Sequence, residues 1–263
     1  MTRLDDTLQT LQANGKKGLF IYITAGAPDF ATTIEAVKAA EKAGADVIEL
    51  GIAFSDPIAD GPVIQKAATI AIQNGATTKK VLDMVKTIRS FTQIPLIGMG
   101  YINTMLNFGV EKFIQEFKAA GLDGMIIPDM PHEESADIAQ ICKDNAFHLI
   151  EFVTPNTIQT RIREICTSAN GFIYCVSVNG VTGVRKIDYK PINDVVQLVK
   201  KETTVPLAVG FGIGTPAAAL EASEYADHVI VGSAVVKLIL EKNVAGAGEL
   251  IQSIRQALDK VGL

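Results

Sequence analysis

The stretch that decides the fold runs from residue 19 to residue 51 and reads LFIYITAGAPDFATTIEAVKAAEKAGADVIELG. It begins with an apolar run, Leu19–Thr24, and ends with a second one, Val47–Gly51. Between them the turn signal Ala27-Pro28-Asp29 precedes a helical pattern over Thr32–Ala43. Continuous apolar runs of this length are typical of parallel strands that are covered on both faces. The stretch therefore predicts a strand–helix–strand unit with a right-handed crossover.

The same alternation continues to the end of the chain. The predicted strands are Leu19–Thr24, Val47–Gly51, Leu96–Met99, Gly124–Ile127, His148–Val153, Phe172–Val176, Leu207–Val209 and His228–Val231. The predicted helices are Asp5–Asn14, Thr32–Ala43, Val63–Asn74, Thr78–Ser90, Val110–Ala120, Glu133–Asn145, Ile158–Ser168, Ile192–Glu202, Thr215–Ser223, Ser233–Glu241 and Gly246–Val261. Eight repeats favour a closed (β/α)8 TIM barrel with an extra N-terminal helix, and an open parallel sheet is the structural alternative. We expect one α/β domain over residues 1–263, because no linker divides the chain.

Composition limits the classes of partner. The formal net charge of −5 argues against nucleic acid as a bulk electrostatic partner, although backbone amides could still hold one small phosphate. The odd number of cysteines and their spacing indicate neither disulfides nor a metal site, so we expect a reducing cytoplasm and no metal. The polar start of the chain does not resemble a signal peptide, and no apolar run is long enough to span a membrane.

Two carboxylates follow from the second predicted strand. Alternation along Val47–Gly51 points Glu49 into the barrel, where a carboxylate is costly unless it is paired or protonated. A buried glutamate satisfied by a neighbouring donor is one interpretation, and an acid–base group with a raised pKa is the favoured one, because barrel sites lie at the carboxyl ends of the strands. Asp56 and Asp60 in the next loop could each stabilise a turn. Together with Glu49 they suggest a pair in which one carboxyl group carries a proton and the other stays ionised in a polar loop.

The loops after the last two predicted strands are rich in glycine. They read Gly210-Phe211-Gly212-Ile213-Gly214 and Gly232-Ser233-Ala234, and Ser233 has the character of an N-cap. Tight turns could explain the glycines, but this is the usual phosphate site of a barrel, and helix amides there would face an anion. The stretch 177–185 after the sixth strand is either a mobile lid or a plain solvent loop.

These residues together resemble the tryptophan synthase alpha family over essentially the whole chain. The densest match is ELGIAFSDPIADGP at 49–62, followed by IPDMP at 127–131, GVTG at 180–183, GFGI at 210–213 and GSA at 232–234. The resemblance implies retro-aldol cleavage of indole-3-glycerol phosphate to indole and glyceraldehyde 3-phosphate in tryptophan biosynthesis. It implies that Glu49 is the general acid–base group and that Asp60 binds the indole N–H.

The resemblance also implies roles for the rest of the site and for a partner. The residues that would bind the indole and glyceryl parts of the substrate are Tyr22, Tyr101, Tyr174 and Thr182, and those that would bind its phosphate are Gly183, Phe211, Gly212, Ile213, Gly232 and Ser233. The chain would need no cofactor, because PLP would belong to a beta subunit in an alpha2beta2 heterotetramer. The expected docking loop is Ala53, Phe54, Ser55, Asp56 and Pro57, in which Ala53 stands where the family usually has proline.

Three other functions remain possible at this point. A stand-alone indole-releasing lyase would use the same chemistry without a partner. Another phosphate-sugar barrel, such as an isomerase, would explain the glycine-rich loops but not the Asp60 loop. A catalytically weak chain that mainly activates its partner is opposed by the presence of both Glu49 and Asp60. For all of them, the decisive geometry is whether the two carboxyl groups share a cavity whose far end is lined by amides.

Overall fold

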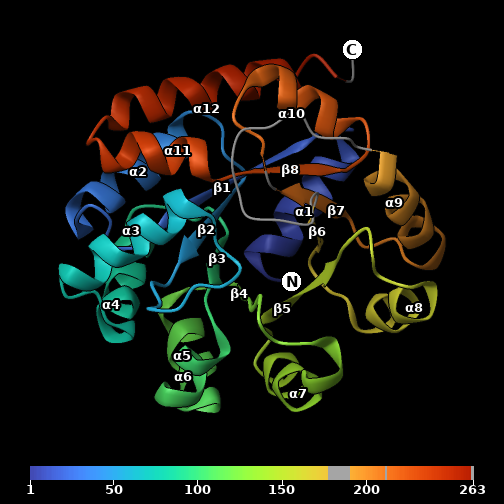
Figure 1. Ribbon diagram of the computed structural model, residues 1–263, viewed down its shortest axis with the longest axis horizontal. Helices are drawn as coiled ribbons and strands as arrows, with labels where there is room; N and C mark the ends of the chain where they lie inside the picture. Colours follow the sequence, from blue (N-terminus) through green and yellow to red (C-terminus); the bar gives the residue numbers. More distant parts are fainter. Residues whose placement is uncertain (177–189, 211, 262–263) are drawn as a thin grey trace.

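The computed structural model, which describes residues 1–176, 190–210 and 212–261, contains a closed barrel of eight parallel strands in chain order (Figure 1). The strands are β1 (Gly18–Thr24), β2 (Val47–Gly51), β3 (Leu96–Met99), β4 (Gly124–Ile126), β5 (His148–Val153), β6 (Ile173–Val176), β7 (Leu207–Gly210) and β8 (His228–Val231). The pairing of β1 with β8 closes the ring, which confirms the barrel and excludes the open sheet.

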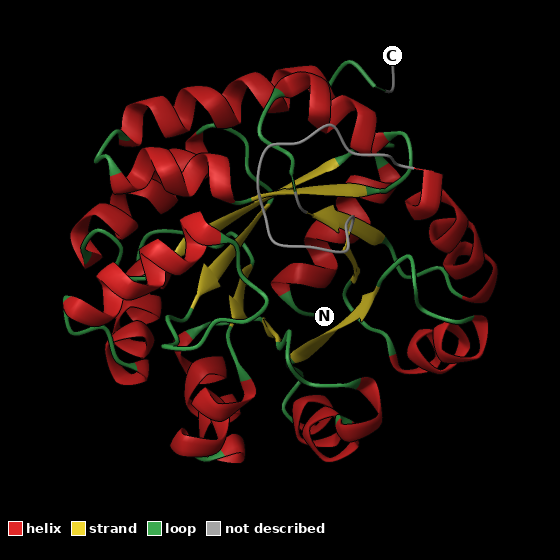
Figure 2. Ribbon diagram, viewed as in Figure 1, coloured by secondary structure: helices red, strands yellow, loops and turns green. Residues whose placement is uncertain are grey.

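Helices form an outer ring around the strands, except for α1, which covers one end of the barrel (Figure 2). They are α1 (Arg3–Ala13), α2 (Phe30–Lys42), α3 (Pro62–Gln73), α4 (Thr78–Arg89), α5 (Ile102–Phe108), α6 (Val110–Ala120), α7 (Ala136–Asp144), α8 (Gln159–Ser168), α9 (Lys190–Glu202), α10 (Pro216–Ser223), α11 (Ser233–Leu240) and α12 (Val244–Leu258). A short 3-10 helix, His132–Glu134, precedes α7 where one continuous helix was predicted. Helix α5 was not predicted. No helix in the described part of the chain is long and apolar enough to cross a membrane.

Strand alternation sorts the core into two layers. In β1, the side chains of Leu19, Ile21 and Ile23 pack outward against the helices, whereas Phe20 lies in the core cluster inside the barrel. Strand β1 is thus largely apolar on both faces, as expected of a parallel strand enclosed by helices. The inward positions nearest the carboxyl ends of the strands are the ones left to form a site.

Helix α1 closes the opposite end of the barrel and appears at the centre of the ring in Figure 1. Its Leu4 and Leu8 side chains pack in the same interior cluster as Phe20. A capping box begins the helix, because the Thr2 hydroxyl accepts the Asp5 N–H and the Asp5 carboxylate accepts the Thr2 N–H. Helix α1 therefore covers the amino-terminal end of the strands, and the opening of the barrel lies at their carboxyl ends.

Asp123, in the turn before β4, ties this closed end together. Its buried carboxylate lies 3.3 Å from Arg3 and 3.3 Å from Arg89, and it accepts the Leu96 N–H at 3.0 Å. A buried carboxylate with two cationic partners is stabilised only while both are present. We therefore regard Asp123 as a structural residue.

Candidate active site

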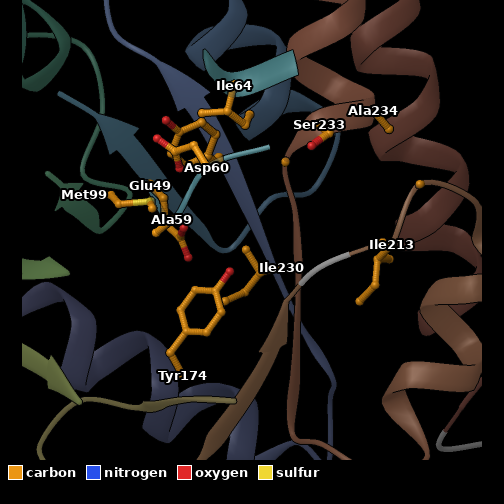
Figure 3. Close-up of a pocket in the computed structure, with 14 residues that line it drawn as sticks. Glu49, Ala59, Asp60, Ile64, Met99, Tyr174, Ile213, Ile230, Ser233 and Ala234 are labelled. Carbon is orange, nitrogen blue, oxygen red and sulfur yellow. The ribbon is translucent and has the colours of Figure 1, made fainter. Parts of the chain in front are cut away.

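A cavity of about 70 Å³ lies at the carboxyl ends of the strands and opens to solvent. Its lining residues come from five strands (β1, β2, β3, β6 and β8), from the loops beyond β2, β7 and β8, and from the starts of α3 and α11: Tyr22, Glu49, Ala59, Asp60, Ile64, Met99, Tyr174, Gly212, Ile213, Gly214, Ile230, Gly232, Ser233 and Ala234. Figure 3 shows the two carboxyl residues on one side of the cavity, with Ser233, Ala234 and Ile213 on the other. The structure thus brings the predicted carboxyl pair and much of the predicted phosphate loop into one space.

Glu49 is the more deeply buried of the two carboxyl groups. Its side chain points inward from β2 and is 1% exposed, and its Oε1 atom has no hydrogen-bond partner among the residues described. Burial raises the pKa of Glu49 to about 8, because an ionised carboxylate would lose its hydration there. Near pH 7 the group is therefore mostly protonated and can act as an acid.

Asp60 lies in the loop that folds back from β2 toward α3. Among the hydrogen bonds that hold the loop, the Asp60 N–H donates to the Pro57 carbonyl at 3.0 Å and Gln65 donates to the Asp60 carbonyl at 2.8 Å. The prediction of a polar loop was wrong for this residue: it is only 8% exposed, because the loop turns in over the barrel. Burial raises the pKa of Asp60 to about 6, while a hydrogen bond from Tyr101 opposes the rise.

Tyr101 connects the loop after β2 to the start of α5. Its hydroxyl oxygen accepts the Ala59 N–H at 3.0 Å, and its ring stacks on Phe54 at a centroid separation of 5.2 Å. The Ile102 N–H next to it donates to Asp129 at 2.9 Å, which fixes the beginning of α5. Tyr101 therefore contacts both Phe54, in the predicted docking loop, and the carboxylate of Asp60.

Two tyrosines that line the cavity, Tyr22 and Tyr174, each pack against a glycine of the neighbouring strand. A side chain added at Gly51 would overlap the Tyr22 hydroxyl, and one added at Gly210 would overlap the Tyr174 hydroxyl. In each case the glycine stands at the carboxyl end of the strand that follows the tyrosine's own strand. The missing side chains let both rings lean across to the neighbouring strand. Tyr174 also directs its hydroxyl into the space near Glu49 (Figure 3).

Backbone groups of the last two loops line the opposite end. Gly212 has a φ of +74°, a conformation that side-chain-bearing residues rarely adopt. Helix α11 begins at Ser233, so its first amide groups lack acceptors within the helix and border the cavity. The prediction that Ser233 is the N-cap was wrong: Gly232 occupies that position, and no side chain caps the helix.

Several predicted residues lie elsewhere or outside the described residues. Thr182, Gly183 and Phe211 belong to the undescribed positions. In the predicted docking loop, Ser55 and Asp56 are exposed and Ala53, Phe54 and Pro57 are half-buried. The sequence analysis missed Ala59, Ile64, Met99 and Ile230 as lining residues, and it gave no individual role to Gly214 and Ala234 in the two glycine-rich loops. Alternation along β8 could have found Ile230. Ile64 could not have been found this way, because it reaches the cavity from α3.

A closed (β/α)8 barrel with two buried carboxyl groups and free helix amides in one cavity belongs to the class of barrel enzymes that act on small organic substrates. In the described part of the chain, no group of three potential metal ligands comes together. The family model described as "Tryptophan synthase alpha chain" matches residues 8–261. The chain therefore belongs to the tryptophan synthase alpha chain family.

Individual relatives agree with the family model. A tryptophan synthase alpha chain from Desulfatibacillum aliphaticivorans is 42% identical over 260 residues, covering 98% of each chain. Another from Petrotoga mobilis is 42% identical over 240 residues, covering 91% of this chain and 93% of its own. The crystal structure of tryptophan synthase subunit alpha from Legionella pneumophila superimposes with a TM-score of 0.92 at 38% identity, covering 99% of both chains.

Proposed function

We propose that this cavity cleaves indole-3-glycerol phosphate into indole and glyceraldehyde 3-phosphate, the lyase reaction of the tryptophan synthase alpha chain family. The observation that supports the residue roles is the shared cavity: it places a fully buried carboxyl group, Glu49, beside a second one, Asp60, that accepts a hydrogen bond. Two carboxyl groups whose environments separate their pKa values are suited to opposite protonation states at one pH.

Glu49 would begin and end the reaction in its protonated form. It donates its proton to indole C3, which leaves positive charge on the ring. The resulting carboxylate then removes the proton of the adjacent glyceryl hydroxyl. The bond between C3 and the glyceryl carbon breaks as that oxygen becomes the aldehyde, and the bonding electrons return to the ring. Proton transfer by a well-placed group of this kind contributes about 10²- to 10⁴-fold in rate.

Asp60 would remain ionised while Glu49 is protonated. Its carboxylate would accept the indole N–H and stabilise the positive charge that develops on the ring after C3 is protonated. Tyr174 and Tyr22 would form walls of the indole site, and Tyr101 would hold the Asp60 loop through the Ala59 N–H. We infer that Thr182, which lies outside the described residues and follows β6 in sequence, also contributes to the site.

The substrate phosphate would occupy the amide-lined end of the cavity. Gly212 and Ile213 approach from the loop after β7, and Gly232 and Ser233 from the start of α11. The positive end of the α11 helix dipole and its unpaired amides both favour an anion there. Gly183 and Phe211 complete the set that we propose.

We further propose that the mouth of the barrel docks on a PLP-containing beta subunit in an alpha2beta2 complex. Large apolar side chains are exposed in three loops or helices at this end: Ile58 is 78% exposed, Leu106 56% and Ile158 67%. Large apolar side chains exposed at one end of a barrel are suited to burial against a partner. The three cysteines are unpaired and buried, which agrees with the cytoplasmic location that we propose.

The function is tested by supplying indole-3-glycerol phosphate to the purified chain and measuring indole release, with and without a beta subunit. We expect slow release by the chain alone and a large increase with the partner. Equal rates in both conditions would support a stand-alone lyase and reject the complex. No release in either condition would reject the lyase itself.

The residue roles are tested with Glu49→Gln and Asp60→Asn. Each variant should bind substrate but lose about 10²-fold or more in kcat, because a proton donor or a stabilising charge is removed. Glu164→Gln is the matched control, since Glu164 is exposed on α8. Normal turnover by Glu49→Gln would reject its acid–base role.

A further inference from the structure

Phe54 lies outside the cavity but contacts a residue that reaches Asp60. Neither Phe54 nor Tyr101 is among the described residues that line the cavity. Their rings stack, with the centroids 5.2 Å apart and the ring planes at 22° to each other. Tyr101 in turn donates a hydrogen bond to the Asp60 side chain. The series of contacts from Phe54 through Tyr101 therefore reaches the Asp60 carboxylate from outside the space in which a substrate would lie.

The Tyr101 hydroxyl proton is directed by the backbone of the same loop. The hydroxyl oxygen accepts the Ala59 N–H at 3.0 Å, so the phenol's own proton is free to go to another acceptor. The carboxylate of the next residue, Asp60, is the side chain that receives it. Tyr101 is only 3% exposed, so little water competes for either bond. One phenol thus holds both the backbone and the carboxylate of this loop segment.

Two contacts hold the Tyr101 ring in this direction. The Ile102 N–H donates to the Asp129 carboxylate at 2.9 Å, which fixes the backbone next to the ring. The ring itself lies against Phe54, which is half-buried although the next two residues are exposed. A tyrosine side chain turns about two torsions, and a stacked neighbour restricts both. Phe54 is thus placed to decide where the Tyr101 hydroxyl points.

We propose that Phe54 is a positioning residue that acts through Tyr101, whose O–H group it keeps aimed at the Asp60 carboxylate. The inference rests on the proposed function for its catalytic meaning, because Asp60 is the group that would accept the indole N–H. Phe54 itself transfers no proton. Hydrogen bonds weaken steeply as they bend, so a Tyr101 ring without its stacked neighbour would be a poorer donor to Asp60.

The test is the titration of Asp60 in the substrate-free chain without a partner, followed by NMR of carboxyl-labelled aspartates, with Asp60→Asn identifying the signal. Phe54→Leu keeps an apolar side chain but removes the flat ring. We expect the pKa of Asp60 to rise by about 0.3 to 0.7 pH unit, part of the effect of losing one hydrogen bond to the ionised form. The other titratable groups that face Asp60, which are Glu49, Tyr22 and Tyr174, keep their protons near pH 6, because burial raises the pKa of each.

Two matched variants separate the stacked ring from a general effect of substitution. Phe54→Tyr keeps a flat ring at this position and should leave the pKa of Asp60 unchanged. Phe91→Leu makes the same substitution in a ring that is 39% exposed and lies under Lys38, and it should also leave the pKa unchanged. An Asp60 pKa that is the same in Phe54→Leu as in the unmodified chain would overturn the proposal.

The route through Tyr101 is tested with a double variant. Tyr101→Phe removes the donor, so Phe54→Leu added to it should raise the pKa of Asp60 no further. Full additivity of the two changes would show that Phe54 acts by another route, and would also overturn the proposal. Because this titration needs no turnover, its result is distinct from failure of the lyase function, which is seen as absence of indole release by the unmodified chain.

Discussion

The burial of Glu49 should destabilise the folded protein at neutral pH, and its neutral analogue should reveal by how much. The ordinary pKa of 4.5 is raised to about 8 on folding. Below pH 4.5 the group is protonated in both folded and unfolded states and contributes no pH dependence. As the pH rises above 4.5, the unfolded chain ionises first, so stability is lost progressively until the folded group also ionises near pH 8.

The expected magnitude follows from the difference in pKa. At about 1.4 kcal/mol per pH unit, the loss relative to acid conditions is about 1 kcal/mol at pH 5, about 3 at pH 7 and about 5 at pH 9. Glu49→Gln has the same shape but cannot ionise, so it escapes this loss. The variant should therefore be nearly inactive and yet more stable than the unmodified chain, by a margin that grows with pH.

The assay is urea unfolding of both proteins at pH 5, 7 and 9, with the exposed Glu164→Gln as control. The difference in the free energy of unfolding between the two proteins is compared across the three pH values, which cancels any pH-independent effect of the amide on packing. The control should follow the unmodified chain at every pH. Parallel stability curves for Glu49→Gln and the unmodified chain would refute the argument, because they would mean that Glu49 has the same pKa in the folded and unfolded states.

Three other perturbations have defined outcomes. The rate of indole release should show a bell-shaped dependence on pH. It should fall below about pH 6, where Asp60 gains a proton, and above about pH 8, where Glu49 loses one. A rate that is constant between about pH 5 and 9 would contradict both assignments. Asp123→Asn should lower the free energy of unfolding by about 2–4 kcal/mol, since two arginines lose their buried partner, and a loss below about 1 kcal/mol in urea unfolding would count against that role. Gly51→Ala should lower stability by about 1–3 kcal/mol through overlap with Tyr22, so an unchanged midpoint would show that the ring is not held there.

The barrel could be predicted because its strands and most of its helices are indicated by patterns within short stretches of the sequence. Alternation within β1 and β2 already separates the side chains that face the helices from those that face the interior, and the inward position of Glu49 follows from it. Helix α5 was missed because it is only two turns long and its start is fixed from a distance, by the Asp129 carboxylate accepting the Ile102 N–H. No signal within residues 102–108 reports that contact.

The errors at the site have the same origin. Asp60 lies in a stretch rich in turn residues, which predicts solvent exposure, but the packing of the loop over the barrel buries it. Ser233 has the composition of an N-cap, yet the chain enters α11 one residue earlier, at Gly232. In both cases the type of the residue suggested a local role. The burial of Asp60 and the start of α11 depend instead on how these segments pack against the rest of the barrel.

The placement of Tyr101 explains how a rigid barrel can hold an acid and a base in one buried site. Glu49 needs an apolar environment to keep its proton, whereas Asp60 needs hydrogen-bond donors to remain ionised a short distance away. An ammonium or guanidinium group would stabilise Asp60 but would also lower the pKa of Glu49, because charge acts over the whole cavity. Neutral phenols act only through contact. The hydrogen bond from Tyr101 to Asp60 therefore lets the two carboxyl groups differ in charge while they share one cavity.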